Sequence, residues 1–371
     1  MSDLGGLLSP DQLSLASAMR AVAEKALAIA SDVTLIFVTN LQSGAVADVG
    51  PAGLLNTAQH YTRSQAEEII RSLQSLGVTV ETYFTEVEFV RAMVGIDRRD
   101  DQRHRVVFTT AEGGSGSGRR ALVPAICNLL GLPVLNSGAH ACSIARHKFH
   151  SGAVLGRVGV RVPTTWLFGD HGWLGGQRPP DGSRVIVKPT YESMCIGVDE
   201  DSVQIVDAAF QGFVGSRRDV FKQPVVVQEF ISGEEVGVPL VRVGRTFALP
   251  PVAFRRASGE PYGHVAKTFK AENIDHDTSH AFFEAPPAQY AAIQRTAVLA
   301  FDALEMRGVG RVDLRVDADG RAWVFDTNES PPPLRQTSYA LAMQSLGFSL
   351  EEMLAVWLGI CLLDFGIVSG V

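Results

Sequence analysis

The sequence predicts an α/β amino-terminal domain built on a doubly wound parallel sheet, followed by two smaller α+β domains. Three observations support this fold class. The chain has 371 residues, which is too many for one ordinary core. Its first third alternates strand-like and helix-like segments with short connections. From Lys148 onward, short strands are separated by turns rich in glycine and proline. We expect divisions at 1–147, 148–227 and 228–371.

The amino-terminal third supplies the parallel sheet. Val33–Thr39 is a continuous β-branched and apolar run, which is typical of a buried parallel strand. Thr62–Leu76 is an amphipathic helix with Thr62 or Ser64 as its N-cap and Gly77 as its end. The remaining elements expected here are helices over 15–30, near 86–93 and over 121–130, and strands over 78–83 and 105–110.

Short strands characterise the middle of the chain. We expect them to form one antiparallel unit, and they cover 164–168, 184–188, 225–230 and 236–243. A helix over 288–306, strands over 310–316 and 322–326 and two terminal helices follow. The apolar run Met353–Val371 is interrupted by Asp364 and is too short to cross a bilayer, so we interpret it as a helix docked on a core.

Composition excludes several classes of protein. The net charge is −7 with no block of like charges, which argues against nucleic acid as the main partner. The four cysteines lack CxxC spacing, so neither a zinc knuckle nor a disulfide framework is expected. No basic-then-apolar block opens the chain, so we expect a cytoplasmic protein without a membrane partner.

A glycine-rich stretch, AEGGSGSGRR, follows Thr110 and precedes the helix over 121–130. Glycines allow backbone N–H groups to approach an anion, so a phosphate loop is one interpretation. The stretch lacks the GK[ST] ending of a P-loop, and an unsupported glycine motif is a weak signal. We therefore favour a flexible loop on the substrate side.

Acidic residues near the end of the chain predict a metal site. Asp313 and the pair Asp326 and Asn328 lie on two arms of a hairpin whose turn is Asp317–Gly320. Antiparallel pairing can bring them together as an all-oxygen site of the kind that Mg²⁺ prefers. The alternative is an exposed hairpin with solvated acids. The apolar run AWVF before Asp326 favours the metal site, because clustered buried acids require a cation.

Two further strands end in polar residues. Lys188 ends the strand VIVKP, where its ammonium could neutralise phosphate oxygens, although a lysine that merely extends to solvent is the simpler interpretation. The strand VVVQEFI runs into Ser232–Glu235, which could contact adenine and ribose or form a hinge between domains.

Taken in order, these motifs resemble those of the ATP-grasp superfamily, and most closely those of the D-alanine–D-alanine ligase group. The resemblance runs from about Leu129 to about Met353, through Asn136-Ser137-Gly138, Lys148, VIVKP, VVVQEFISGEE, GRVDLRVD and FDTNESPPP. The spacings 326 − 313 = 13 and 328 − 326 = 2 match the metal-ligand spacing of that family. The resemblance implies an ATP-grasp fold, with a central lid domain and a carboxy-terminal catalytic domain.

The resemblance also implies site residues. Lys148 and Lys188 would contact the ATP phosphates, and Tyr191–Gly197, with Glu192, Ser193 and Gly197, would be a lid over them. Gln228, Glu229, Phe230 and Ile231 would line adenine, and Glu235 would hold the ribose. Lys267 would cover the γ-phosphate, Arg311 would stabilise the oxyanion, and Asp313, Asp326 and Asn328 would bind Mg²⁺ or Mn²⁺.

Several positions depart from the pattern of the family. Met194 stands in the lid where serine is usual, and Pro332 stands where the family has a glycine that donates an N–H to the oxyanion. Asp326 replaces a glutamate and Gln228 an adenine-contacting glutamate. These differences argue against a standard D-alanine–D-alanine ligase. Arg335 could clamp a substrate carboxylate or could be a surface arginine.

The function expected from the sequence is ATP- and magnesium-dependent ligation of a carboxylate to an amine through an acyl-phosphate, on amino-acid-like substrates. Two alternatives remain open: activation of a carboxylate for a hydroxyl acceptor, and a degenerate nucleotide-binding scaffold or sensor. The resemblance implies a homodimer.

Overall fold

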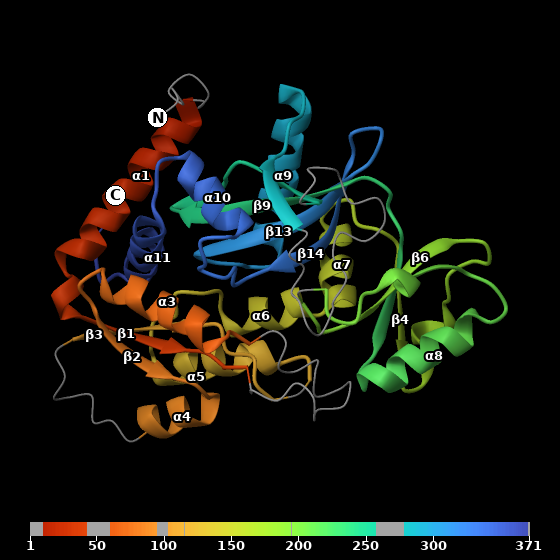
Figure 1. Ribbon diagram of the computed structural model, residues 1–371, viewed down its shortest axis with the longest axis horizontal. Helices are drawn as coiled ribbons and strands as arrows, with labels where there is room; N and C mark the ends of the chain where they lie inside the picture. The colour runs from red at the N-terminus through yellow and green to blue at the C-terminus, as the bar shows by residue number, and fades with distance from the viewer. Residues whose placement is uncertain are drawn as a thin grey trace.

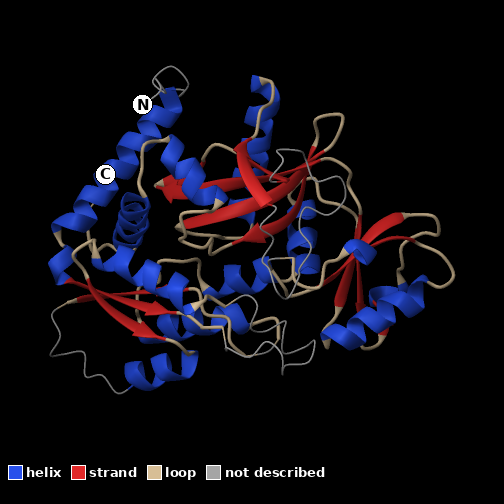
Figure 2. Ribbon diagram, viewed as in Figure 1, coloured by secondary structure: helices blue, strands red, loops and turns tan. Residues whose placement is uncertain are grey.

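The computed structural model describes residues 10–42, 60–94, 103–114, 116–193, 195–256 and 278–369. Three sheets organise these residues. Figure 1 shows a three-stranded sheet toward one end of the long axis and a five-stranded sheet at the other. A six-stranded sheet lies between them, and helices separate the layers, as Figure 2 shows.

The three-stranded sheet is parallel and has helices on both faces. Strand β1 (Val33–Val38) lies between β2 (Thr79–Tyr83) and β3 (His104–Thr109). One set of β1 side chains packs toward α1 (Pro10–Ala28) and α3 (Arg63–Gln74), and the alternate set packs toward α4 and α5. This arrangement confirms the doubly wound prediction, and it explains why every residue of β1 is buried.

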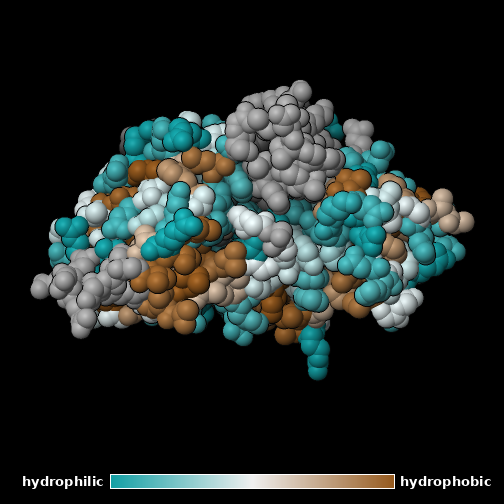
Figure 3. Space-filling view, turned by 90° about the horizontal axis from the view of Figure 1, so that it is seen from below, coloured by the Kyte–Doolittle hydropathy of each residue, from teal (hydrophilic) through white to brown (hydrophobic). Residues whose placement is uncertain are grey.

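The helices of this part begin and end at the residues expected from sequence, within a few positions. Thr62, not Ser64, caps α3 through a capping box with Gln65. The other helices here are α4 (Glu86–Val94) and α5 (Leu122–Leu130). Val87 of α4 and Leu122 and Leu129 of α5 are exposed apolar residues. Figure 3 shows apolar side chains gathered on part of the face that it draws.

The central sheet is antiparallel, with strand order β5-β4-β8-β6-β7. Helix α8 (Phe210–Phe221) covers one face, where Val185, Val187 and Val227 join its core. The alternate residues of the same strands therefore face away from α8. The strands are β4 (Thr165–Gly169), β5 (Gly172–Trp173), β6 (Arg184–Pro189), β7 (Val203–Ile205) and β8 (Val225–Glu229).

The segment 236–243 belongs to a different sheet from the one expected. It forms β9 (Glu234–Val243), which pairs with β13 in the carboxy-terminal sheet. Periodicity predicts a buried strand but not its partner, and here burial of Val236 and Val238 beneath α9 decides the pairing. The sheet order is β12-β11-β9-β13-β14, with β10 paired to β9.

The bounds of the remaining elements are as follows. The strands are β10 (Arg245–Ala248), β11 (Val252–Arg256), β12 (Thr278–Phe282), β13 (Val309–Val316) and β14 (Ala322–Asn328). The α-helices are α6 (Ala139–Arg146), α7 (Lys148–Arg157), α9 (Pro287–Ala303), α10 (Ser338–Ser345) and α11 (Leu350–Asp364). Short 3₁₀ turns are η2 (Ala30–Asp32), η4 (Arg119–Ala121), η5 (Leu174–Gly176) and η6 (Glu200–Ser202).

The expected division between 227 and 228 falls inside β8, which continues to Glu229. Because a domain boundary divides two sheets more naturally than it divides one strand, we propose that the central domain ends after Glu229. The division at 147 coincides with the start of α7 at Lys148.

Helix α11 packs against α1, so the first and last described helices of the chain share one core. Almost all of α11 is buried, including Trp357. Within the described residues, no single helix is long and apolar enough to span a membrane. Helices α10 and α11 meet that test only as a pair, and they are bent by 95° relative to one another.

The contact between α1 and α11 predicts that Gly359→Ala destabilises the protein. A Cβ at Gly359 would lie 2.3 Å from the carbonyl oxygen of Val22, so the helices would have to separate. We expect the free energy of unfolding in urea to fall by about 1–3 kcal/mol. Gly212→Ala is the matched control, because Gly212 lies in α8 with open space around it. That substitution should stabilise the protein by about 0.5–1 kcal/mol through helix propensity, and equal effects at both positions would contradict the packing argument.

Candidate active site

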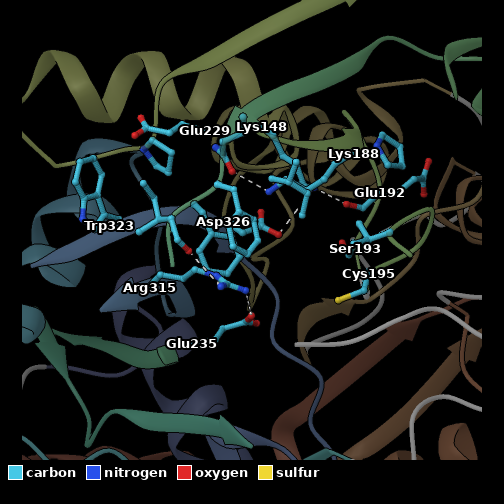
Figure 4. Close-up of a pocket in the computed structure, with 18 of the residues that line it drawn as sticks. Lys148, Lys188, Glu192, Ser193, Cys195, Glu229, Glu235, Arg315, Trp323 and Asp326 are labelled. Carbon is cyan, nitrogen blue, oxygen red and sulfur yellow. Dashed lines mark hydrogen bonds and ion pairs between the residues drawn. The ribbon is translucent and has the colours of Figure 1, made fainter. Parts of the chain in front are cut away.

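A pocket lies between the central and carboxy-terminal sheets and collects side chains from five strands, the start of α7 and the segment after β6 (Figure 4). Its lining includes ten of the site residues predicted from sequence. These are Lys148, Lys188, Glu192, Ser193, Gln228, Glu229, Phe230, Ile231, Glu235 and Asp326.

Strand alternation explains how β6 and β8 contribute to the pocket. Ile186 and Lys188 point away from α8, as does Gln228, which lies opposite Ile186 in the ladder. The buried Lys188 Nζ donates to Gln228 Oε1 at 2.9 Å and lies 5.3 Å from the ring centre of Phe325. Gln228 in turn donates to Thr165 Oγ1 at 3.1 Å, so its amide is satisfied on both sides.

The environment of Lys188 makes its ammonium easy to deprotonate. Burial and the neighbouring Lys148 lower its pKa, while Asp326 acts in the opposite direction, and together these effects bring the pKa to about 8. Lys148 is the first residue of α7, and its Nζ donates to the carbonyl oxygen of Glu192 and lies 3.9 Å from Asp326 Oδ2. An anionic ligand between these two lysines would offset the cost of burying them.

The other end of the pocket is aromatic. Two guanidinium groups contact the ring of Phe230. The Cζ of Arg184 lies 4.5 Å from the ring centre, and the Cζ of Arg315 lies 5.0 Å from it. Arg315 also donates to the carbonyl oxygen of Ile231 at 3.2 Å and lies 3.4 Å from Glu235 Oε2. Arg315 therefore fixes the segment that follows β8 against β9.

Arg315 was not predicted as a site residue, although its position in the strand is a signal. Arg311, Asp313 and Arg315 are spaced by two in one strand, so they share a face of β13. Trp323 and Phe325 also line the pocket and were missed. They belong to the apolar run AWVF, which was expected only to be buried.

The predicted acidic cluster forms across β13 and β14. Asp313 lies directly opposite Asp326, and Arg311 lies opposite Asn328. Asp313 is buried and accepts from Arg311 with both oxygens, at 2.6 Å from Nε and 2.8 Å from Nη2. Although burial alone would lower it, the pKa of Arg311 is raised by the Asp313 carboxylate.

A β-bulge sets this register. The pairs 314–324, 315–323 and 316–322 would, if continued without a break, put Asp326 opposite Val312, because 314 + 324 = 312 + 326. The register instead shifts between Asp313 and Leu314, and Phe325 is the extra residue. The bulge therefore brings Asp326 and Trp323 to the same face of the sheet, next to one another.

The donor set fits a hard divalent cation. Two carboxylates and the amide of Asn328 offer oxygen only, and among the described residues no group of three or more histidines, cysteines, aspartates or glutamates forms a separate ligand cluster. Mg²⁺ takes one or two carboxylates and completes its shell with water and phosphate oxygens. Such a set suits a metal that binds together with a nucleotide.

Other predicted residues lie apart from the pocket or outside the described residues. Lys267 and Met194 lie outside the described residues. Gly197 is described, has φ of +72° and packs against Phe221. Arg335 is half-exposed, with its guanidinium 2.5 Å from Glu351 and 3.5 Å from Glu68, and this surface position favours the simpler of its two interpretations.

A second cluster lies beside the pocket and was not expected from the sequence. The end of the glycine-rich stretch forms η4, and Arg119 and Arg120 extend from it into a buried network of acids. Burial would raise the pKa of Glu112, but Arg120, Arg146 and Arg119 hold it at about 2. The cluster comprises Glu112, Arg119, Arg120, Arg146, Glu192 and Glu329.

Comparisons with known proteins agree with this geometry. The family described as D-ala D-ala ligase C-terminus matches residues 182–358. D-alanine–D-alanine ligase of Bordetella petrii is 29% identical over 61% of this chain and 67% of its own length. The enzyme of Albidiferax ferrireducens is 29% identical over 68% and 71%, respectively.

Solved structures share the fold. D-alanine–D-alanine ligase from Bacillus anthracis complexed with ATP has a TM-score of 0.64 at 17% identity and covers 90% of this chain and 99% of its own. The VanG D-Ala:D-Ser ligase from Enterococcus faecalis has a TM-score of 0.61 at 15% identity, covering 88% and 99%.

The three sheets and the pocket between them define an ATP-grasp protein. More particularly, this chain resembles the D-alanine–D-alanine ligases, and it is an ATP-dependent, ADP-forming carbon–nitrogen ligase.

The buried ammonium predicts that Lys188→Met stabilises the ligand-free protein in a pH-dependent way. The pKa of Lys188 falls from 10.5 to about 8 on folding, so the cost of burying its charge is complete below pH 8. That cost disappears as the pH rises toward 10.5. We expect the variant to gain up to roughly 3 kcal/mol in urea unfolding at pH 7, and much less at pH 10.

The exposed Lys222 provides the control for this experiment. Lys222→Met removes a lysine from the surface and should change stability little at either pH. A gain from Lys188→Met that stays constant between pH 7 and pH 10 would show that lost packing or hydrogen bonding, rather than the buried charge, controls the effect.

Proposed function

We propose that this protein uses ATP and Mg²⁺ to activate an amino-acid-like carboxylate as an acyl-phosphate, which an amine then attacks. The observation that carries the proposal is one pocket that holds two buried lysines and Asp326, which lies opposite Asp313 in the β13–β14 ladder. Cations are needed where a carboxylate must approach a phosphate, because both are negative.

The residues of this chain divide the work. Lys148 and Lys188 would neutralise phosphate oxygens, because both line the same pocket. Asp313, Asp326 and Asn328 would hold Mg²⁺, which when bound screens the phosphate charge. Arg311 is fixed by Asp313, and its Nη1 also donates to Ser338 Oγ at 3.5 Å, so its second Nη1 hydrogen would be presented to the oxyanion that forms during amine attack.

The aromatic end would hold the nucleoside. Phe230 and Trp323 provide apolar surface for adenine, and the backbone of Ile231 supports its polar edge. Glu235, oriented by Arg315, would accept from ribose hydroxyl groups. The solved relative from Bacillus anthracis, which shares the fold, was captured with ATP.

For the substrate, we propose an amino acid other than D-alanine. Where the resembled family has a glycine that donates an N–H to the oxyanion, this chain has Pro332, which has no N–H. Met194 in the lid is a second difference on the substrate side. From the resemblance to the same family, we also propose that the protein forms a homodimer.

The competing proposal is a nucleotide-binding scaffold or sensor without ligase activity. Pro332 favours it, because a missing oxyanion donor weakens acyl transfer. The pair Asp313 and Arg311 weighs against it, since a protein that only binds nucleotide does not need a half-buried arginine held by a carboxylate at both Nε and Nη2.

Phosphate release from ATP and Mg²⁺, measured against pools of D- and L-amino acids, tests the ligase proposal. We expect one pool to stimulate release and Asp313→Asn to lower the stimulated rate by about 10²-fold or more, because the variant loses a metal ligand. Asp319→Asn is the matched control, since Asp319 is an exposed carboxylate in the turn of the same hairpin. Stimulation by no pool, with ATP still bound, would favour the scaffold.

D-Alanine supplied alone tests the proposed substrate difference. We expect phosphate release with D-alanine to stay at the level without any amino acid, while another amino acid stimulates it. The products should be separated by mass spectrometry, so that a dipeptide is distinguished from simple ATP hydrolysis. Formation of D-alanyl-D-alanine at a comparable rate would refute the proposal and assign the standard activity.

A further inference from the structure

One buried ion pair links the amino-terminal domain to the segment that begins the proposed lid. Arg119, in η4, meets Glu192, which follows β6 by three residues. The guanidinium donates to both carboxylate oxygens, at 3.2 Å from Nη1 to Oε1 and 2.7 Å from Nη2 to Oε2. The two side chains are 3% and 1% exposed, so this joint is sealed from water.

Glu192 also accepts hydrogen bonds from Gln223 and Lys148, which belong to the central domain. Gln223 Nε2, just before β8, donates to its Oε1 at 2.7 Å. Lys148 Nζ donates to its backbone carbonyl oxygen. The residue therefore connects the amino-terminal domain through its carboxylate and the proposed phosphate-binding lysine through its backbone.

Two neighbouring contacts reinforce the joint. Arg146, the last residue of α6, contacts both Ser193 Oγ and Glu112. Arg120 lies 3.0 Å from Glu329, the residue after Asn328 in the chain, and 3.1 Å from Glu112. The same buried network thus meets the lid segment on one side and the end of the metal-binding strand on the other.

The positive and negative charges of this network balance. Three arginines meet three glutamates, so the buried cluster is neutral. Breaking one pair while both partners stay buried leaves an uncompensated charge. Removing either partner of the Arg119–Glu192 pair therefore favours a position of the lid segment in which the remaining charge reaches water.

We infer that Arg119 is a positioning residue that holds the lid segment over the nucleotide by binding Glu192. The inference rests on the proposed function, because the nucleotide is the ligand that the lid would cover. Arg119 does not line the pocket and acts through Glu192. The amino-terminal domain, which lies on the proposed substrate side, thereby sets the position of the lid segment. Binding of the substrate and binding of the nucleotide would then be coupled.

Variants of the full chain test the inference through nucleotide affinity and hydrogen exchange. We expect Arg119→Met to weaken binding of Mg²⁺ and a non-hydrolysable ATP analogue by about 5- to 150-fold in calorimetry, the usual range for coupled sites. Peptides covering 189–198 should exchange faster in the ligand-free variant than in the wild type. Arg119→Lys keeps the charge but loses the bidentate contact, so its affinity and its exchange should lie between those of the wild type and those of Arg119→Met.

A double variant distinguishes action through Glu192 from a general structural role. If Arg119 acts through Glu192, Arg119→Met combined with Glu192→Gln should bind the analogue about as weakly as the weaker single variant. Losses that multiply, or an Arg119→Met protein with wild-type affinity and wild-type exchange over 189–198, would overturn the inference. If Arg119→Met does not fold, the Lys variant and Glu192→Gln carry the comparison in the same way.

Arg105→Gln is the matched control. Arg105 forms an ion pair with Glu81 at 3.4 Å inside the amino-terminal sheet, so its loss should leave affinity and exchange unchanged. Failure of the wild type to bind the analogue would count against the proposed function. The exchange of 189–198 in the ligand-free proteins would then still decide the inference.

Discussion

The site depends on one irregularity, the β-bulge between β13 and β14. An unbroken ladder would pair Asp326 with Val312 and turn its carboxylate away from Asp313. The bulge shifts β14 by one residue, so the two aspartates face one another while the strand closer to the turn keeps its regular register. Trp323, Asp326 and Lys148 can then share one pocket, and the proposed metal and nucleotide functions both follow from that juxtaposition.

A second constraint is the burial of charge around that pocket. Lys188 and Lys148 lie within it, and six further charged side chains form the adjoining network. Such groups are costly to remove from water unless each has a partner. In the network the partners are supplied by the protein. In the pocket the lysines face each other with Asp326 as their shared counter-charge, which leaves positive potential for an anionic ligand.

Many elements could be predicted because local signals specify them. Thr62 caps α3, which ends at Gln74, close to the expected Gly77, and the uninterrupted apolar run of β1 indicates burial on both faces. The hairpin that carries Asp313 and Asp326 follows from its turn residues. The assignment of β9 to the wrong sheet has a different origin. Alternation marks a strand as buried, but its partner depends on which other apolar faces remain uncovered once the chain has folded.

By itself, the sequence determined the element types, the order of the motifs and the chemistry of each strand end, because these depend on residues a few positions apart. Tertiary structure decided which of those ends meet. Arg119 and Glu192 are 73 residues apart, and Arg120 and Glu329 are 209 apart. No local pattern relates such positions, since their pairing arises only when three separately folded sheets pack together and exclude water from the charges between them.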